Sequence, residues 1–444
     1  MTTTSSSVTE KEKTLRATSN QQPAASNQVA VYIHIPFCHH RCSYCDFNIY
    51  AGLKSLYAPY IEAIAEEIAV TAARVGRVRV PSIYLGGGTP SLLPIELISS
   101  LLSAVRTFCD VAADVEVTLE VNPTANVRSP TTVSRQEAVV SAQYFGQLRS
   151  LGVNRLSLGV QSSHEDELQL LRRGHSFQDA VTTYESARQA GFDNVNVDLI
   201  YGLPNQPLAN WRTTLERVIA LRPDHISAYS LQIEPRTAML RWVQAGRVPE
   251  PEEDVVATMY ELAQEMLEQA GFEHYEISNW ARCAEPALAG LPSQASNSFD
   301  EQARSHDLRS THNLVYWRNA PYFGFGCGAH SSFAGRRYSN VLHPREYIER
   351  IRQGGEAVVE VEQIDRALEM GETLMLGLRL IEEGVARARF RDRFGVELDE
   401  VYGATLARLI EQGLLESDAE HICLTVRGRL LGNHVFGEFL PHEA

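Results

Sequence analysis

The sequence lacks a long hydrophobic run, an excess of basic residues and a dense, paired set of cysteines. No run of about eighteen apolar residues occurs, so we expect no membrane-spanning helix. Lys and Arg number 40 against 55 Asp and Glu, and the net charge of −15 argues against a nucleic-acid partner. Seven cysteines in 444 residues are too few and too uneven for a disulfide scaffold. They indicate a reducing compartment, so we expect a cytoplasmic location.

Length and composition predict a folded protein with more than one domain. Its 444 residues are 44% hydrophobic and 21% charged, which is ordinary for a folded chain. Residues 1–28 are rich in Ser, Thr, Gln and Asn, and we expect a disordered tail there. That tail has no apolar core, which excludes a secretory signal, and its Glu10 and Glu12 argue against a transit peptide.

Short apolar runs alternate with helical patterns from residue 29 onward. The helical pattern at 57–75 is one example, since Ile61, Ile64 and Ile68 recur on one face. Repeated strand–helix alternation predicts parallel strands with crossover helices, as in a doubly wound sheet or most of a (β/α) barrel. The six predicted strands are 29–35, 82–85, 116–121, 155–160, 194–200 and 225–233.

Polar or glycine residues follow the C-terminal end of each predicted strand. Chemistry collected from the ends of many strands is typical of a barrel, whereas an open sheet concentrates it at one point. We therefore expect a barrel core at 29–282. The strand-end residues include the cysteine loop 38–45, the glycine run 86–91, Glu120, Asn122, Gln161, Ser162, Asp198, Gln232 and Glu234.

The rest of the chain predicts an insertion and a smaller domain. Residues 283–311 are polar and irregular, which indicates a flexible surface insertion. Residues 312–444 predict a linking segment and a C-terminal domain with helices at 365–380 and 399–412. A hairpin at 414–424 and a last helix capped by Thr425 give this domain a winged-helix-like pattern.

Three cysteines, Cys38, Cys42 and Cys45, are spaced C-x3-C-x2-C on the loop after the first strand. Thiolates at this spacing can converge on one soft metal centre, and three leave one iron of a four-iron cluster open for a small molecule. The alternatives are three buried thiols, or a zinc site whose fourth ligand is His34, His39 or His40.

The segment from His34 to Phe47 resembles the radical SAM superfamily, and more narrowly its coproporphyrinogen III oxidase-like branch. The resemblance covers roughly residues 29–444. It implies a partial (β/α)6 TIM-like barrel with a (4Fe-4S) cluster on Cys38, Cys42 and Cys45. It also implies S-adenosylmethionine at the open iron, contacted by Tyr32, Tyr44, Gly87, Gly88, Thr89, Glu120, Gln161, Arg173 and Asp198.

Two departures separate this chain from the oxidase of that branch. The oxidase resembles C-x3-C-x2-C-x-C, but the position of its further cysteine is Phe47 here, and residues 1–28 lack the pattern of its ordered extension. The chain instead resembles the HemW-type haem chaperones, which carry an H-N-x-x-Y-W signature linked to haem. The matching residues, which the resemblance assigns to haem, are His312, Asn313, Tyr316 and Trp317.

We therefore expect a radical SAM-type haem chaperone that delivers haem to haem-dependent client proteins and has an electron donor. The alternatives are an oxygen-independent coproporphyrinogen III oxidase, a zinc-stabilised binding module, and a nucleic-acid-modifying radical enzyme, which the charge disfavours. Whether S-adenosylmethionine is cleaved, whether the chain forms a homodimer, and whether it contacts membrane proteins transiently all stay open. No role is assigned to Cys109, Cys283, Cys327 or Cys423.

Overall fold

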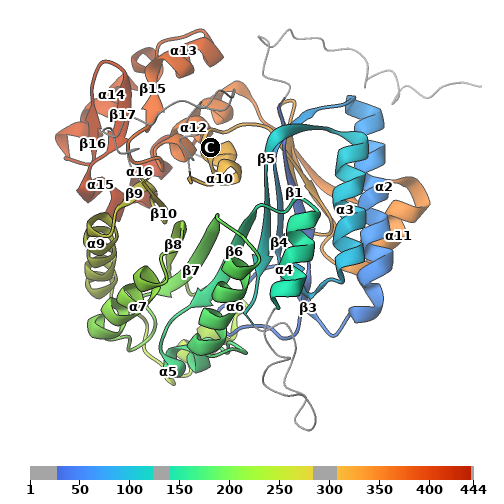
Figure 1. The fold of residues 1–444 in the computed structure, drawn as a ribbon. Coiled ribbons are helices and arrows are strands. Elements are labelled where there is room, and N and C mark those ends of the chain that lie inside the picture. The colour runs from blue at the N-terminus through green and yellow to red at the C-terminus, as the bar shows by residue number, and fades with distance from the viewer. Residues whose placement is uncertain (1–27, 124–140, 284–307, 442–444) are drawn as a thin grey trace, which may run out of the picture.

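The computed structural model describes residues 28–123, 141–283 and 308–441 (Figure 1). Nearly all of the predicted tail at 1–28 and most of the predicted insertion at 283–311 lie outside these residues. None of the described helices is long and apolar enough to cross a membrane.

A twelve-stranded sheet dominates the fold, with the order β14-β13-β12-β11-β1-β4-β5-β6-β7-β8-β10-β9. All six predicted strands are present and run parallel to one another, which confirms the predicted barrel-type core. The last one is shorter than predicted, since it ends at Ser230. Their bounds are β1 (Ala30–Ile35), β4 (Arg79–Gly87), β5 (Asp110–Val121), β6 (Arg155–Gln161), β7 (Val195–Tyr201) and β8 (His225–Ser230).

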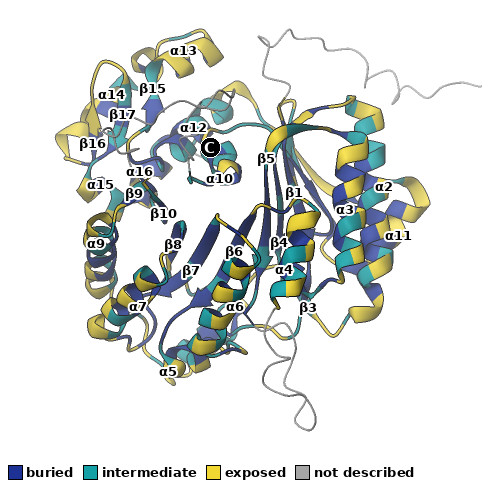
Figure 2. Cartoon of the chain, in the orientation of Figure 1, coloured by how far each residue is buried: buried dark blue, intermediate teal, exposed yellow. Residues whose placement is uncertain are grey.

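Crossover helices cover the convex face of the curved sheet (Figure 1). Each has a buried stripe toward the strands and an exposed outer face, as Figure 2 shows. On α2 the buried stripe includes Tyr60, Ile61, Ile64 and Ile68, which contains the predicted face. These helices are α2 (Tyr57–Val75), α3 (Ile95–Phe108), α4 (Ala142–Ser150), α6 (Phe177–Gln189) and α7 (Leu208–Ala220), while the short α5 (Glu165–Leu170) follows the end of β6.

The parallel strands alternate between apolar and polar side chains, because successive residues of a strand face opposite sides of the sheet. On β4, Ile83 and Leu85 belong to the main hydrophobic core, whereas Ser82 and Tyr84 face polar partners. On β5 the core residues Val117 and Leu119 alternate with carboxylates and a threonine. The concave side of the sheet is therefore lined largely by polar groups, and the convex side packs against the helices.

Antiparallel strands extend the sheet at both ends, so the barrel is partial rather than closed. Beside β8 lie β10 (Asn279–Arg282) and β9 (Phe272–Glu276), preceded by α8 (Ala238–Gln244) and α9 (Glu253–Gln269). Beside β1, residues from the predicted linking segment join the same sheet. These are β11 (Tyr322–Phe325), parallel to β1, then β12 (His330–Phe333), β13 (Arg336–Asn340) and β14 (Val358–Gln363), with α10 (Thr311–Trp317) and α11 (Pro344–Gly354).

The C-terminal part has its own hydrophobic core. The two predicted helices, the hairpin and the last helix are present, and the Thr425 hydroxyl caps that helix by accepting from the Gly428 N–H. One strand, β15, and two helices, α13 and α16, were not predicted from the sequence and complete the domain. Its elements are α12 (Arg366–Gly377), β15 (Val385–Ala386), α13 (Arg387–Phe394), α14 (Leu398–Glu411), β16 (Leu415–Ser417), β17 (His421–Leu424), α15 (Val426–Leu430) and α16 (Gly432–Gly437).

Candidate functional site

The three motif cysteines lie on the loop that follows β1 and is framed by β2 (Phe37–Cys38) and β3 (Tyr50–Ala51). Cys38, Cys42 and Cys45 are free thiols, each partly exposed, and all three line one cavity of about 430 Å³. The same cavity is lined by the ends of β4, β5, β6, β7 and β8. The site is thus collected from the ends of several neighbouring strands, as the barrel prediction requires.

The donor set fits an iron–sulfur cluster better than a single ion. Each thiolate of a cluster binds its own iron, so the three sulfurs need not meet at one point. In the described residues, no three His, Cys, Asp or Glu side chains are placed to hold one metal ion. The His34 ring nitrogens lie 3.0 Å from the Tyr32 hydroxyl and 2.9 Å from the Asn48 carbonyl oxygen, and His40 Nε2 lies 2.8 Å from the Arg172 carbonyl oxygen. Both ring nitrogens of His34 are engaged, which argues against His34 as the fourth ligand of the predicted zinc alternative. His40 also hydrogen-bonds to Cys42.

The surroundings of the three thiols differ. Burial raises the pKa of the Cys38 thiol, whose Sγ lies 3.4 Å from the Thr89 hydroxyl. Burial likewise raises the pKa of Cys45 to about 12. Burial also acts on Cys42, but the Arg173 guanidinium and His40 outweigh it and lower the pKa of that thiol to about 7. Cys42 is therefore the thiol most readily ionised for metal binding.

The glycine run at the end of β4 brings two backbones together. Gly87 has a φ of +108°, and a Cβ there would lie 2.4 Å from the His34 ring. A Cβ on Gly88 would lie 2.7 Å from the carbonyl oxygen of Phe37. Close backbone approach is the expected use of such glycines, and here the approach is to β1 and the cysteine loop. The glycines thus place the cysteine loop against β4 at the edge of the cavity.

Two buried carboxylates face the cavity. Glu120 accepts from the Tyr84 hydroxyl at 3.0 Å and from the Gly87 N–H at 2.9 Å. Burial and the nearby Asp198 raise the pKa of Glu120 to about 7. Asp198 accepts from the Ser157 hydroxyl and the Asn196 amide, each at 2.8 Å, while burial raises its pKa. Carboxylates in this setting suit a ligand with an ammonium group and ribose hydroxyls.

Arg173 supplies the opposite charge on the same cavity. Its guanidinium donates to the Gly159 carbonyl oxygen at 2.8 Å and lies 3.5 Å from Cys42 Sγ. Its Nε is buried and has no hydrogen-bond partner among the described residues. An unused donor of this kind suits a carboxylate ligand. The carboxylates and the guanidinium of this cavity therefore fit the ammonium and carboxylate groups of S-adenosylmethionine.

All the residues predicted to contact S-adenosylmethionine line this cavity except Tyr32. Tyr32 lies behind it, and its hydroxyl is 3.0 Å from His34 Nδ1. The structure adds Tyr84, Ser157 and Tyr229, which the sequence analysis did not select. The alternation of side chains along each strand is the signal that indicates them. Each of these residues lies two positions from another residue on the concave face of its strand.

The predicted haem residues lie elsewhere, on the short helix α10. His312 is 1% exposed, and its ring nitrogens lie 3.0 Å from the Ser82 hydroxyl and 3.1 Å from the Tyr316 hydroxyl. Trp317 packs under the Arg379 guanidinium, which lies 4.4 Å from the ring centre. Asn313 and Trp317 are four residues apart and share one face of the helix. None of these residues lines the cavity of the cysteines.

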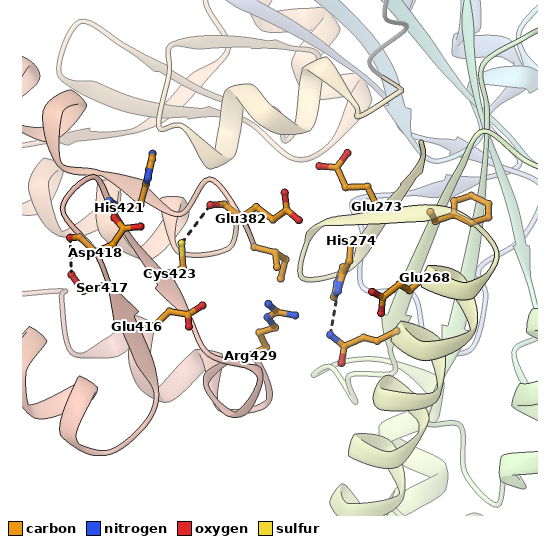
Figure 3. Close-up of a pocket in the computed structure, with 13 residues that line it drawn as sticks. Glu268, Glu273, His274, Glu382, Glu416, Ser417, Asp418, His421, Cys423 and Arg429 are labelled. Carbon is orange, nitrogen blue, oxygen red and sulfur yellow. Dashed lines mark hydrogen bonds between the residues drawn. The ribbon is translucent and has the colours of Figure 1, made fainter. Parts of the chain in front are cut away.

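A second cavity, of about 590 Å³, lies between α9, β9 and the C-terminal domain (Figure 3). None of the residues predicted to be functional lines it. Its lining is mixed and includes five carboxylates, with Arg429 and Cys423 on the side of the C-terminal domain. The carboxylates are Glu268, Glu273, Glu382, Glu416 and Asp418.

Comparison with known proteins identifies matching families and relatives. The model of the Radical SAM superfamily matches residues 32–218, and that of the HemN C-terminal domain matches residues 364–431. The chain is 35% identical to the haem chaperone HemW of Bacillus subtilis, over 93% of this chain and 99% of that protein. It is 32% identical to the haem chaperone HemW of Lactococcus lactis, over 93% and 97% of the two chains.

Among solved structures, the coproporphyrinogen III oxidase HemN of Escherichia coli has the same fold. The TM-score is 0.75, the sequence identity is 24%, and the match covers 95% of this chain and 92% of that one. The fold and the cysteine cavity thus define a radical SAM protein. Within that superfamily, the chain belongs to the HemW family of haem chaperones.

Proposed function

We propose that this protein binds a (4Fe-4S) cluster, S-adenosylmethionine and haem, and delivers the haem to client proteins that need it. The observation that carries the proposal is the cavity in which three thiols, two buried carboxylates and a buried guanidinium meet, in a chain of the HemW family. The proposed location is the cytoplasm, with an electron donor as a further partner.

Cys38, Cys42 and Cys45 hold three irons of the cluster in this proposal. When bound, the cluster supplies an electron and an open iron to S-adenosylmethionine. Arg173 binds the carboxylate of that ligand, and Glu120 accepts from its ammonium group. Asp198, oriented by Ser157 and Asn196, accepts from the ribose. Thr89 donates toward Cys38 and so orients one cluster ligand.

The haem part of the proposal rests on the resemblance of residues 312–317 and on the family. Phe47, which stands where the oxidase has a further cysteine, is 62% exposed and lines the cavity with the three thiols. An exposed aromatic face there suits contact with a flat, apolar ligand. Asn313, Tyr316 and Trp317 remain the proposed haem contacts of α10. Both ring nitrogens of His312 are engaged, so iron ligation by His312 requires one of these two hydrogen bonds to break.

The cluster assignment predicts which cysteines hold iron. In anaerobically purified protein, we expect Cys38→Ser, Cys42→Ser and Cys45→Ser each to lose most of the iron and acid-labile sulfide. Cys283→Ser is the matched control, because Cys283 is exposed and lies outside the cavity. Iron and sulfide retained in all three cavity variants, or zinc in place of iron, contradicts the assignment.

The haem function is tested by titration and transfer. Purified protein with its cluster is titrated with haem, and the loaded protein is mixed with a haem-free acceptor haemoprotein. We expect saturable haem binding at one site. We also expect the acceptor to gain haem when it is mixed with the loaded protein and not when it is mixed with buffer alone. A parallel anaerobic incubation with coproporphyrinogen III, S-adenosylmethionine and a reductant distinguishes the oxidase. Decarboxylated product without haem binding overturns the proposal.

A further inference from the structure

The ring of His312 packs against the ring of Tyr84, a contact that a role as metal ligand does not explain. Its ring stacks on the Tyr84 ring, with centres 5.0 Å apart and an angle of 28° between the planes. Tyr32 also stacks on Tyr84, at 6.1 Å and 27°, and its ring centre lies 6.4 Å from that of His312. The three rings therefore pack against one another on the concave side of the sheet, and His312 makes the shorter of the two ring contacts to Tyr84.

The far end of Tyr84 reaches the cavity. Its hydroxyl donates to Glu120 Oε1 at 3.0 Å, and Glu120 Oε2 accepts from the Gly87 N–H at 2.9 Å. Both Tyr84 and Glu120 line the cavity, whereas His312 does not. One ring thus connects a buried histidine of α10 with the carboxylate proposed to receive the ammonium group of S-adenosylmethionine.

The histidine itself is held from several sides. Glu116 accepts from the backbone N–H groups of Thr311 and His312, each at 3.0 Å, and so anchors the start of α10 to β5. Ser82, which pairs with Glu116 in the sheet register, lies 3.0 Å from His312 Nδ1. Burial and the Arg155 charge lower the pKa of His312 to about 3, so the ring is neutral and uses one nitrogen as donor and one as acceptor.

We propose that His312 is a positioning residue for the S-adenosylmethionine cavity: its ring holds Tyr84, and Tyr84 holds Glu120. The role rests on the proposed binding of S-adenosylmethionine by Glu120. It makes the histidine of the H-N-x-x-Y-W motif a support behind the cavity lining and leaves haem contact to other residues. A satisfied neutral imidazole stacked on a tyrosine has the geometry of such a support, because neither nitrogen is free for iron.

The test is a double-substitution cycle on S-adenosylmethionine affinity, measured by equilibrium dialysis with protein that retains its cluster. We expect His312→Ala to weaken binding about fivefold to tenfold, the size of one aromatic contact with a hydrogen bond. Tyr84→Phe keeps the ring and removes the bond to Glu120, and we expect a weakening of about threefold to tenfold. If His312 acts through Tyr84, His312→Ala weakens S-adenosylmethionine binding less in the Tyr84→Phe protein than in the native protein.

Thr311→Ala is the matched control, because its side chain is exposed on the same helix. If His312→Ala only destabilises the fold, its melting temperature falls, but its effect on S-adenosylmethionine affinity does not depend on the Tyr84→Phe substitution. Two results overturn the proposal: unchanged affinity for S-adenosylmethionine in His312→Ala, or fully additive effects in the cycle. Haem titration of the same variants separates the two roles. A changed haem spectrum in His312→Ala, with unchanged S-adenosylmethionine affinity, makes His312 an iron ligand and leaves the proposed function standing.

Discussion

At the scale of single residues, both packing and backbone angles require glycine in the run at the end of β4. Gly87 has a φ of +108°, and its α-hydrogen faces the His34 ring, so a side chain would meet that ring at 2.4 Å. Gly52 also has a positive φ, of +77°, but nothing lies within 4 Å of where its Cβ would be. The two positions separate backbone strain from steric overlap.

We predict that Gly87→Ala lowers the free energy of unfolding by about 3 kcal/mol, because strain and overlap add. Gly52→Ala is the control, and we expect a loss of only about 1 kcal/mol from its positive φ. Urea unfolding followed by circular dichroism measures both. Equal losses in the two variants contradict the packing role of Gly87.

A second residue-scale feature is a carboxylate buried away from the cavity. Glu67 of α2 accepts from the Tyr347 hydroxyl and the Asn340 amide, each at 2.6 Å, and from the Gly326 N–H at 2.9 Å. Burial nevertheless raises the pKa of Glu67 to about 7, from an ordinary value of 4.5. Its contribution to stability is therefore complete below about pH 4.5 and is lost as the pH rises through about 7.

We predict that Glu67→Gln flattens the pH dependence of stability. From pH 5 to pH 8.5 the native protein loses up to about 3 kcal/mol of unfolding free energy through this carboxyl, and the variant does not. Glu120 contributes a similar loss in both proteins, so the difference isolates Glu67. The exposed neighbour Glu66, changed to Gln, is the control. Parallel curves of unfolding free energy against pH for the native and Glu67→Gln proteins contradict the prediction.

At the scale of elements, the parallel strands and their helices could be predicted because they follow local patterns. The helix at 57–75 was predicted with the bounds it has, since its apolar face and its terminal glycine are both local signals. The polar side of each strand was not predicted. Ser82 and Glu116 within their strands and Arg155 at the start of β6 are polar residues that make sense only when the sheet brings them together. That arrangement depends on pairing between distant segments.

The contact between β9 and the C-terminal domain is another element-scale feature. Glu276 at the end of β9 is fully buried, and Arg379, just after α12, donates to it through Nε at 3.1 Å and Nη2 at 2.7 Å. The Asn279 amide donates to the other oxygen of Glu276. A buried carboxylate that loses its guanidinium keeps its charge without compensation.

We predict that Arg379→Gln lowers the free energy of unfolding by about 3 to 5 kcal/mol, as expected for breaking a buried ion pair. Arg393→Gln, which breaks the more exposed pair with Glu369, is the control, and we expect at most about 1 kcal/mol. Thermal and urea unfolding of the two variants measure the difference. Similar losses in both variants contradict the buried role of Glu276.

At the scale of the whole molecule, the cysteine loop is held by segments that are far apart in the chain. The Ser43 hydroxyl donates to the Leu170 carbonyl oxygen at 2.7 Å, and the Met239 N–H donates to the Ser43 carbonyl oxygen at 2.8 Å. Spacing alone indicated that the three thiols bind one centre. It could not indicate these supports, because they appear only once the sheet brings the segments together.

Asn48 makes the longest of these connections and carries the last prediction. Its side-chain amide donates to the carbonyl oxygens of Cys327 at 3.2 Å and Leu342 at 2.9 Å. The backbone carbonyl oxygen of Asn48 lies 2.9 Å from His34 Nε2. The side chain thus ties the end of the cysteine loop to the segments around β11 and β13. Removing it leaves two carbonyl oxygens without this donor and frees one side of the loop.

We expect Asn48→Ala to release iron to an anaerobic chelator about threefold to tenfold faster than the native protein, because loss of two hydrogen bonds lets the loop open more often. Absorbance of the iron–chelator complex follows the release. Lys54→Ala, on the exposed surface just beyond the loop, should match the native rate. The initial iron content of Asn48→Ala should also match, since all three thiols are present. An unchanged release rate in Asn48→Ala contradicts the view that distant segments of the chain keep the cysteine loop closed on its cluster.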